Sequence, residues 1–78
     1  MSTTTQIREE LLRRAESMRN MAHGVRLGAK FVEQGQEAEI KEAERLEIEA
    51  LRLEAAAGIR EARKLLVDAG LLRQAEAA

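Results

Sequence analysis

The stretch from Ala43 to Ala62 carries two apolar stripes on nearly opposite sides of a helix, and this feature most constrains the fold. The first, named here the Leu46 stripe, comprises Ala43, Leu46, Ala50, Leu53 and Ala57. The opposite one, the Leu51 stripe, comprises Ile48, Leu51, Ala55, Ile59 and Ala62. Because a helix in a small monomer buries one side only, the second stripe requires another packing partner.

The composition limits the chain to one small helical domain that spans residues 1–78. The chain has no Cys, no Pro and a single aromatic side chain, Phe31. The lack of Cys excludes disulfides and thiolate zinc sites, and it fits a reducing, cytoplasmic location. A chain of this length buries a limited share of its surface, so it usually needs a partner. No signal peptide or membrane span is recognisable, so we expect a soluble protein without membrane contact.

A heptad seam predicts an unbroken first helix over about residues 4–34. Apolar residues recur at alternating spacings in the seam, which comprises Leu11, Ala15, Met18, Ala22, Val25, Ala29 and Val32. Every second member is Ala, so another helix can come close. Gly24 offers a competing break, since an interior Gly costs about 1 kcal/mol, but the seam continues in register beyond it. Gly24 and Gly28 also have Gly-x-x-x-Gly spacing, which here indicates a close crossing or a helix end. Gly35 is the expected C′ residue.

The second helix is predicted over about residues 36–69, with Gly70 as its C′ residue and Leu71 as the apolar residue beyond it. Residues 71–78 are expected to form a short helical or frayed tail. The segment 45–54 also alternates like a strand, but Glu, Ala, Leu and Arg favour helix and no turn residue interrupts it. Gly58 is interpreted as a site of tight packing, with a hinge as the alternative.

Two helices joined near Gly35 are expected to form an antiparallel hairpin in which opposed residue numbers sum to roughly 70. In this register the Leu51 stripe faces the seam, and Ala22 meets Ile48. The same register predicts three ion pairs: Arg26 with Glu47, Arg19 with Glu54 and Arg8 with Glu61. Exposed pairs contribute only about 0–1 kcal/mol each, so they indicate the register and do not decide stability.

The Leu46 stripe is therefore expected to stay exposed and to form a partner interface with a smaller apolar patch on the first helix. The predicted interface residues are Ala43, Leu46, Ala50, Leu53, Ala57, Leu27 and Phe31. Burying one Leu contributes roughly 1.5–3 kcal/mol, which favours association. The main hypothesis is a non-catalytic interaction module that self-assembles into a homo-oligomeric helical bundle. The alternative is a small adaptor or inhibitor that binds a different protein through the same stripe.

No combination of residues predicts an enzyme, a cofactor or a metal site. His23 is the only imidazole, and neither a Glu-x-x-His nor a His-Glu-x-x-His unit surrounds it. The acidic side chains of residues 33–54 are interpreted as a solvated face. We therefore expect no catalytic residues, no cofactor-binding residues and no metal ligands.

A basic stripe on the first helix is the feature that a nucleic acid would contact through its phosphates. The stripe comprises Arg8, Arg19, Arg26 and Lys30. No aromatic residue interleaves with it, the net charge is −1, and Glu47, Glu54 and Glu61 offer an internal partner. A nucleic-acid-binding hairpin dimer is therefore a second and disfavoured alternative.

Overall fold

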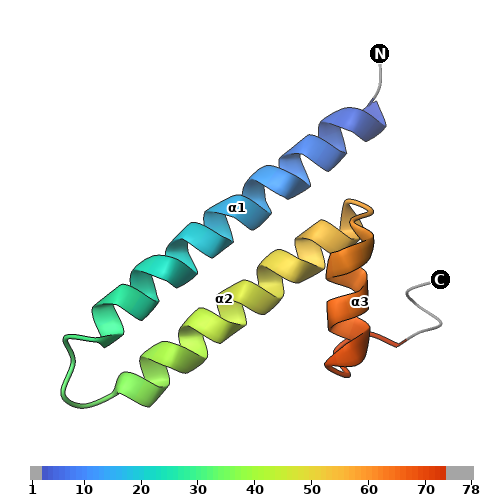
Figure 1. Ribbon diagram of the computed structural model, residues 1–78. Coiled ribbons are helices and arrows are strands. Elements are labelled where there is room, and N and C mark those ends of the chain that lie inside the picture. The colour runs from blue at the N-terminus through green and yellow to red at the C-terminus, as the bar shows by residue number, and fades with distance from the viewer. Residues whose placement is uncertain (1–2, 74–78) are drawn as a thin grey trace.

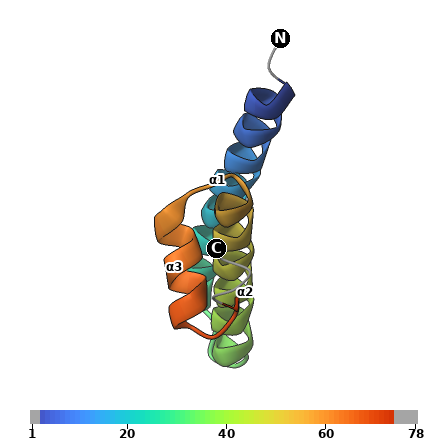
Figure 2. The same ribbon diagram turned by 90° about the vertical axis from the view of Figure 1, so that its right-hand side faces the viewer.

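The structure is a computed structural model that describes residues 3–73, and this part of the chain is all-α, with no strand. Its helices are α1 (Thr3–Ala29), α2 (Gln36–Ala56) and α3 (Arg60–Asp68). α1 and α2 lie side by side and run in opposite directions, and α3 turns back along α2 (Figure 1, Figure 2). The sequence predicts two long helices, whereas the described residues form three.

α1 passes through Gly24 without a break, as the continuous seam predicts. It ends at Ala29, earlier than the expected residue 34, and the next two residues form a turn. The backbone N–H of Phe31 donates to the carbonyl oxygen of Gly28 at 3.1 Å. The Nε2 of Gln36 donates to the carbonyl oxygen of Ala29 at 2.9 Å, which satisfies a terminal backbone acceptor of α1.

Gly35 has the expected left-handed conformation, with φ 81°, but it lies directly before α2 and is not the C′ residue of α1. Its carbonyl oxygen accepts a hydrogen bond from the backbone N–H of Glu39 at 3.1 Å. This is the first hydrogen bond of α2, so Gly35 occupies the N-cap position of that helix.

The α1 side of the helix interface follows the predicted seam. Ala15, Ala22 and Ala29 are buried, which confirms that the small members of the seam face another helix. Two larger members, Met18 and Val25, are half-buried and pack beside Ala22.

α2 turns its Leu46 stripe toward α1, so the prediction that the Leu51 stripe faces α1 is wrong. The buried members of the Leu46 stripe are Ala43, Leu46, Ala50 and Ala57, and Leu53 is half-buried. Ala22 clusters with Ala43 and Leu46, where Ile48 is expected. Alanine on both helices allows this close approach.

The predicted second helix is broken at Gly58, which has φ 92°. The N–H of Gly58 donates to Ala55 O and the N–H of Ile59 donates to Glu54 O, both at 3.0 Å, which is a Schellman ending of α2. A Cβ added to Gly58 would meet no atom within 4 Å. Tight packing therefore does not explain this glycine; its left-handed backbone, which ends α2, does.

α3 packs on α2 and not on α1. The break at Gly58 divides the Leu51 stripe: Ile48, Leu51 and Ala55 lie on α2, where they are half-buried, and Ala62 lies on α3. The buried residues of α3 are Ala62 and Leu66. Leu66 and Arg63 line a shallow hollow together with Arg52 and Ala55 of α2. Ala55 is thus the member of the Leu51 stripe on α2 that lies beside α3.

A second Schellman ending closes α3 at Gly70, which has φ 73°, as predicted for this residue. The N–H of Gly70 donates to Val67 O at 3.0 Å and the N–H of Leu71 donates to Leu66 O at 2.8 Å. Residues 71–73 are not helical, and the remainder of the predicted tail lies outside the described residues.

Replacing Gly58 with Ala should lower the free energy of unfolding by about 1–2 kcal/mol, because an L side chain is strained in the left-handed region. Gly58→Asn is the matched control, since Asn tolerates this conformation better and should retain most of the stability. Urea unfolding of both variants at one protein concentration measures the difference. An Ala variant as stable as the parent would show that the turn does not depend on a left-handed residue.

Candidate interaction surface

The half of α1 that follows residue 16 presents an uncharged surface to solvent on the side opposite α2. With about 100° between successive residues, this side carries Ser17, Asn20, Met21, Gly24, Leu27 and Gly28. All six are exposed. We call this set the outer face. Phe31, the only aromatic residue of the chain, is 87% exposed.

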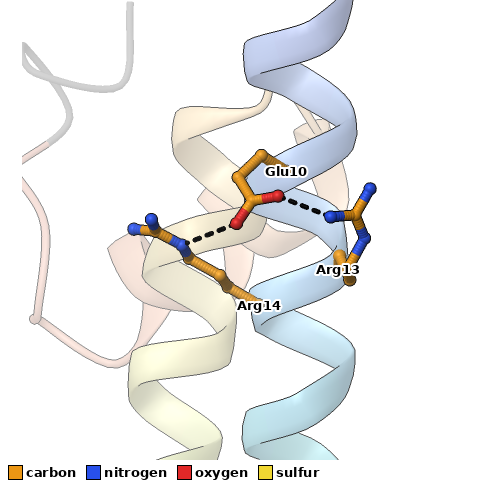
Figure 3. A network of polar contacts seen from close by, with 3 residues as sticks. All are labelled: Glu10, Arg13 and Arg14. Carbon is orange, nitrogen blue, oxygen red and sulfur yellow. Dashed lines mark hydrogen bonds and ion pairs between the residues drawn. The ribbon is translucent and has the colours of Figure 1, made fainter.

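The same side of α1 is charged in its first half. It carries Glu9, Glu10, Arg13 and Arg14, and three of them form a network (Figure 3). Glu10 accepts hydrogen bonds from Arg13 at 2.7 Å and from Arg14 at 3.2 Å. Charged residues make up 35% of the chain. The uncharged outer face on the second half of α1 therefore differs from the charged first half of the same helix.

The outer face continues into a groove between α1 and α2, which we call the Met18 groove. It has a volume of about 640 Å³ and is lined by Met18, Met21, Gly24, Val25, Gly28, Glu39, Glu42, Arg45 and Leu46. The α1 side of the groove is apolar, and the charged residues come from α2. Arg45 donates a hydrogen bond to Glu42, and this bond lowers the pKa of the Glu42 carboxyl. Met21, Gly24 and Gly28 belong to both the groove and the outer face.

Gly24 and Gly28 have no role in the packing of the chain itself. A Cβ added at either position would meet no atom within 4 Å, and neither residue has a positive φ. Each glycine within a helix costs about 1 kcal/mol relative to Ala. The fold of one chain therefore gives no physical reason for two glycines one helical turn apart.

The structure separates the predicted interface residues into two groups. Leu46 is 6% exposed, and Ala43, Ala50 and Ala57 are also buried within the chain, so the expectation that the Leu46 stripe stays exposed is wrong. The reason is the orientation of α2, which turns this stripe onto α1. By contrast, Leu27 and Phe31 are exposed.

Sequence reasoning missed Met21 and Gly28 as neighbours of Leu27 and Phe31. Their signal was present as a run of uncharged positions at spacings of three and four residues. The spacing alone is a weak signal, because it does not show which side of α1 faces solvent. That is known only once α2 is seen to cover the opposite side.

Two of the predicted ion pairs are present. Arg19 contacts Glu54 and Arg26 contacts Glu47, both at 2.5 Å, which confirms the predicted pairing for these residues. The hydrogen bond that Arg19 donates to Glu54 raises the pKa of the Arg19 guanidinium.

The third predicted pair, between Arg8 and Glu61, is replaced. Glu61 belongs to α3, which packs on α2 and not on α1, and the Nε of Arg8 donates to Ala57 O at 3.2 Å. Lys30, the remaining member of the basic stripe, is exposed beyond the end of α1.

His23 is exposed on α1. Within residues 3–73, no three His, Cys, Asp or Glu side chains gather in a way that could hold a metal ion. None of the described helices is long and apolar enough to cross a membrane.

Comparison with known proteins identifies no relative: no family model, no curated protein and no solved structure matches this chain.

Proposed function

We propose that this chain is a non-catalytic helical interaction module that assembles with copies of itself. The distribution of large apolar side chains within residues 3–73 carries the proposal. In this part of the chain Leu46 and Leu66 are the large apolar residues that are buried, and the other buried residues are all Ala. Eight large apolar side chains are exposed, namely Ile7, Met21, Leu27, Phe31, Val32, Ile40, Leu65 and Leu71.

The shape of the molecule supports the same proposal. Its shortest principal extent is 13 Å, which is close to the width of one helix with its side chains. Stable domains usually enclose a core between two packed layers of secondary structure. A single layer of helices leaves its broad faces in water, and a second copy would supply the missing layer.

A second copy is a suitable partner because two copies of a chain with almost no net charge can associate without a partner of opposite charge. The net charge of the chain is −1, so copies repel one another only weakly. Arg19 and Arg26 are already paired with Glu54 and Glu47 in the same chain, which leaves less of the basic stripe available to phosphates. Both points favour self-association over a highly charged partner.

Thermal unfolding followed by circular dichroism tests the proposal. For a chain that assembles, Tm should rise with protein concentration, because association stabilises the folded state by mass action. A range of about 100-fold in concentration should move Tm by several degrees. A Tm that does not change over this range would contradict self-assembly and would leave a different protein as the partner.

A further inference from the structure

We propose that α3 is a movable segment, which opens on Gly58 and joins α2 in one continuous helix. The closed arrangement, in which α3 turns back along α2 (Figure 2), is then one of two folded states of the chain. In the open state α1 and α2 remain paired. The inference concerns a single chain, so it holds or fails independently of the proposed self-assembly.

The apolar residues on either side of Gly58 keep one helical register, and this observation carries the inference. The residues in register are the Leu51 stripe and, one step further, Leu66, namely Ile48, Leu51, Ala55, Ile59, Ala62 and Leu66. At about 100° per residue, a continuous helix places all of them within an arc of about 80°. A turn between two separate helices imposes no such condition on the spacing across it. The sequence therefore fits a continuous helix as well as the closed arrangement.

Little of the backbone has to change for the two helices to join. Ala57 already has a right-handed helical conformation, with φ −81° and ψ −1°. Gly58, with φ 92°, and Ile59, with φ −77° and ψ 111°, are the residues that depart from the helix. Glycine adopts right-handed and left-handed conformations about equally well, so it does not oppose the change. Rotation about the dihedral angles of two residues therefore converts one state into the other.

The backbone of α3 gains hydrogen bonds within the helix when α2 and α3 join. In the closed state Ile59 caps α3 without a side-chain hydrogen bond, and the first N–H groups of a helix have no partner within it. In the continuous helix the N–H groups of Arg60, Glu61 and Ala62 would donate to the carbonyl oxygens four residues earlier. These bonds offset part of the apolar burial that opening removes.

The closed state depends on one side of α3. α3 packs on α2 and makes no contact with α1, and its buried residues are Ala62 and Leu66. Opening exposes these two residues and leaves the interface between α1 and α2 in place. It also aligns them with Ile48 and Leu51 in a stripe about 27 Å long. The position of α3 thus sets how much apolar surface the chain presents.

The distance between two spin labels tests the proposal. The chain has no Cys, so labels can be attached specifically to a Glu44→Cys, Asp68→Cys double variant. Both positions are exposed, one on α2 and the other at the end of α3. A continuous helix places their Cα atoms about 36 Å apart, whereas the closed chain turns back at Gly58 and keeps them much closer. Dilution in an excess of unlabelled chain restricts the measurement to distances within one molecule.

Leu66→Glu should move most of the labelled population to the long distance, because a carboxylate is costly to bury in the closed state and lies in water in the open state. Helix content by far-UV circular dichroism should equal or exceed that of the parent. Leu65→Glu is the matched control, since Leu65 is already 55% exposed, and the short distance should persist. A short distance in Leu66→Glu would overturn the proposal. So would a broad range of distances with lower helix content, because α3 would then unfold instead of joining α2.

Gly58→Ala tests the turn itself. Ala is strained in the left-handed conformation and is more favourable than Gly inside a helix, so the share of the long distance should rise at least about 10-fold over the parent. Gly58→Asn is the control, because Asn tolerates the left-handed conformation and should leave the closed state dominant. A Gly58→Ala chain without the long distance would contradict the proposal.

Discussion

A chain that carries Leu46→Glu should be largely unfolded at room temperature. Leu46 is 6% exposed and belongs to the buried cluster with Ala22 and Ala43. Removing a buried Leu costs about 2–5 kcal/mol, and an unpaired carboxylate at the same position adds a desolvation cost of several kcal/mol. Small domains are stable by only about 5–15 kcal/mol, so the two effects together are enough to unfold the chain. Far-UV circular dichroism should show loss of most of the helical signal.

Ile40→Glu is the control on the same helix. Ile40 is exposed, so a Glu there remains in water, and helix content should match that of the parent. A Leu46→Glu chain that keeps its helices as well as the control does would show that the Leu46 stripe does not face α1. The half-buried Ile48 would then be the next residue to test, because the Leu51 stripe is the alternative inner side.

The second large effect is expected at Leu66, where substitution by Ala should lower the free energy of unfolding by about 2–5 kcal/mol. Leu66 is 2% exposed and is the largest fully buried side chain in the described part of the chain. It connects α3 to α2, and α3 makes no contact with α1 that could replace it. We therefore expect α3 to separate from α2 before α1 and α2 separate from each other.

Leu65→Ala provides a matched comparison, because the neighbouring side chain is 55% exposed. This change should cost less than about 1 kcal/mol. Urea unfolding of both variants at one protein concentration gives the two free energies, and amide hydrogen exchange shows whether α3 opens first. Equal effects of the two substitutions would mean that α3 does not pack on α2 through Leu66.

Local and periodic signals in the sequence predicted several elements correctly. The seam identified the buried Ala15, Ala22 and Ala29, because small residues at heptad spacing on a charged helix are typical of a contact with another helix. Because the seam continues in register beyond Gly24, it also correctly predicted that α1 is unbroken at this glycine. Gly70 was identified because an apolar residue follows it, as a Schellman ending requires.

The sequence could not decide which stripe of α2 faces α1. Both stripes contain Ala together with Leu or Ile, so their apolar character is similar. The ion pairs do not distinguish them either, because Glu47 and Glu54 lie on the helix surface between the two stripes. Arg26 and Arg19 can therefore pair with them whichever stripe is turned inward.

The break at Gly58 was equally hidden. A glycine inside a helix costs about 1 kcal/mol, which is too little to decide between a continuous helix and a turn. What decides is tertiary packing: turning the chain at Gly58 lets Ala62 and Leu66 be buried against α2. That gain depends on residues distant from the glycine, and no local pattern reveals it.

The candidate surface was predicted only in part, since Leu27 and Phe31 were named and Met21 and Gly28 were not. Because the Leu46 stripe is buried, the outer face of α1 is the surface that we propose for a partner. Exposure is a property of the whole fold, so this assignment could not be made from the spacing of residues alone.

Self-association of the chain is the central claim, and its mass in solution tests that claim most directly. Sedimentation equilibrium of the unmodified chain over micromolar to millimolar concentrations should reveal a species of twice the 8.7 kDa of a single chain, with its share increasing at higher concentration. A mass of 8.7 kDa throughout that range would contradict the account.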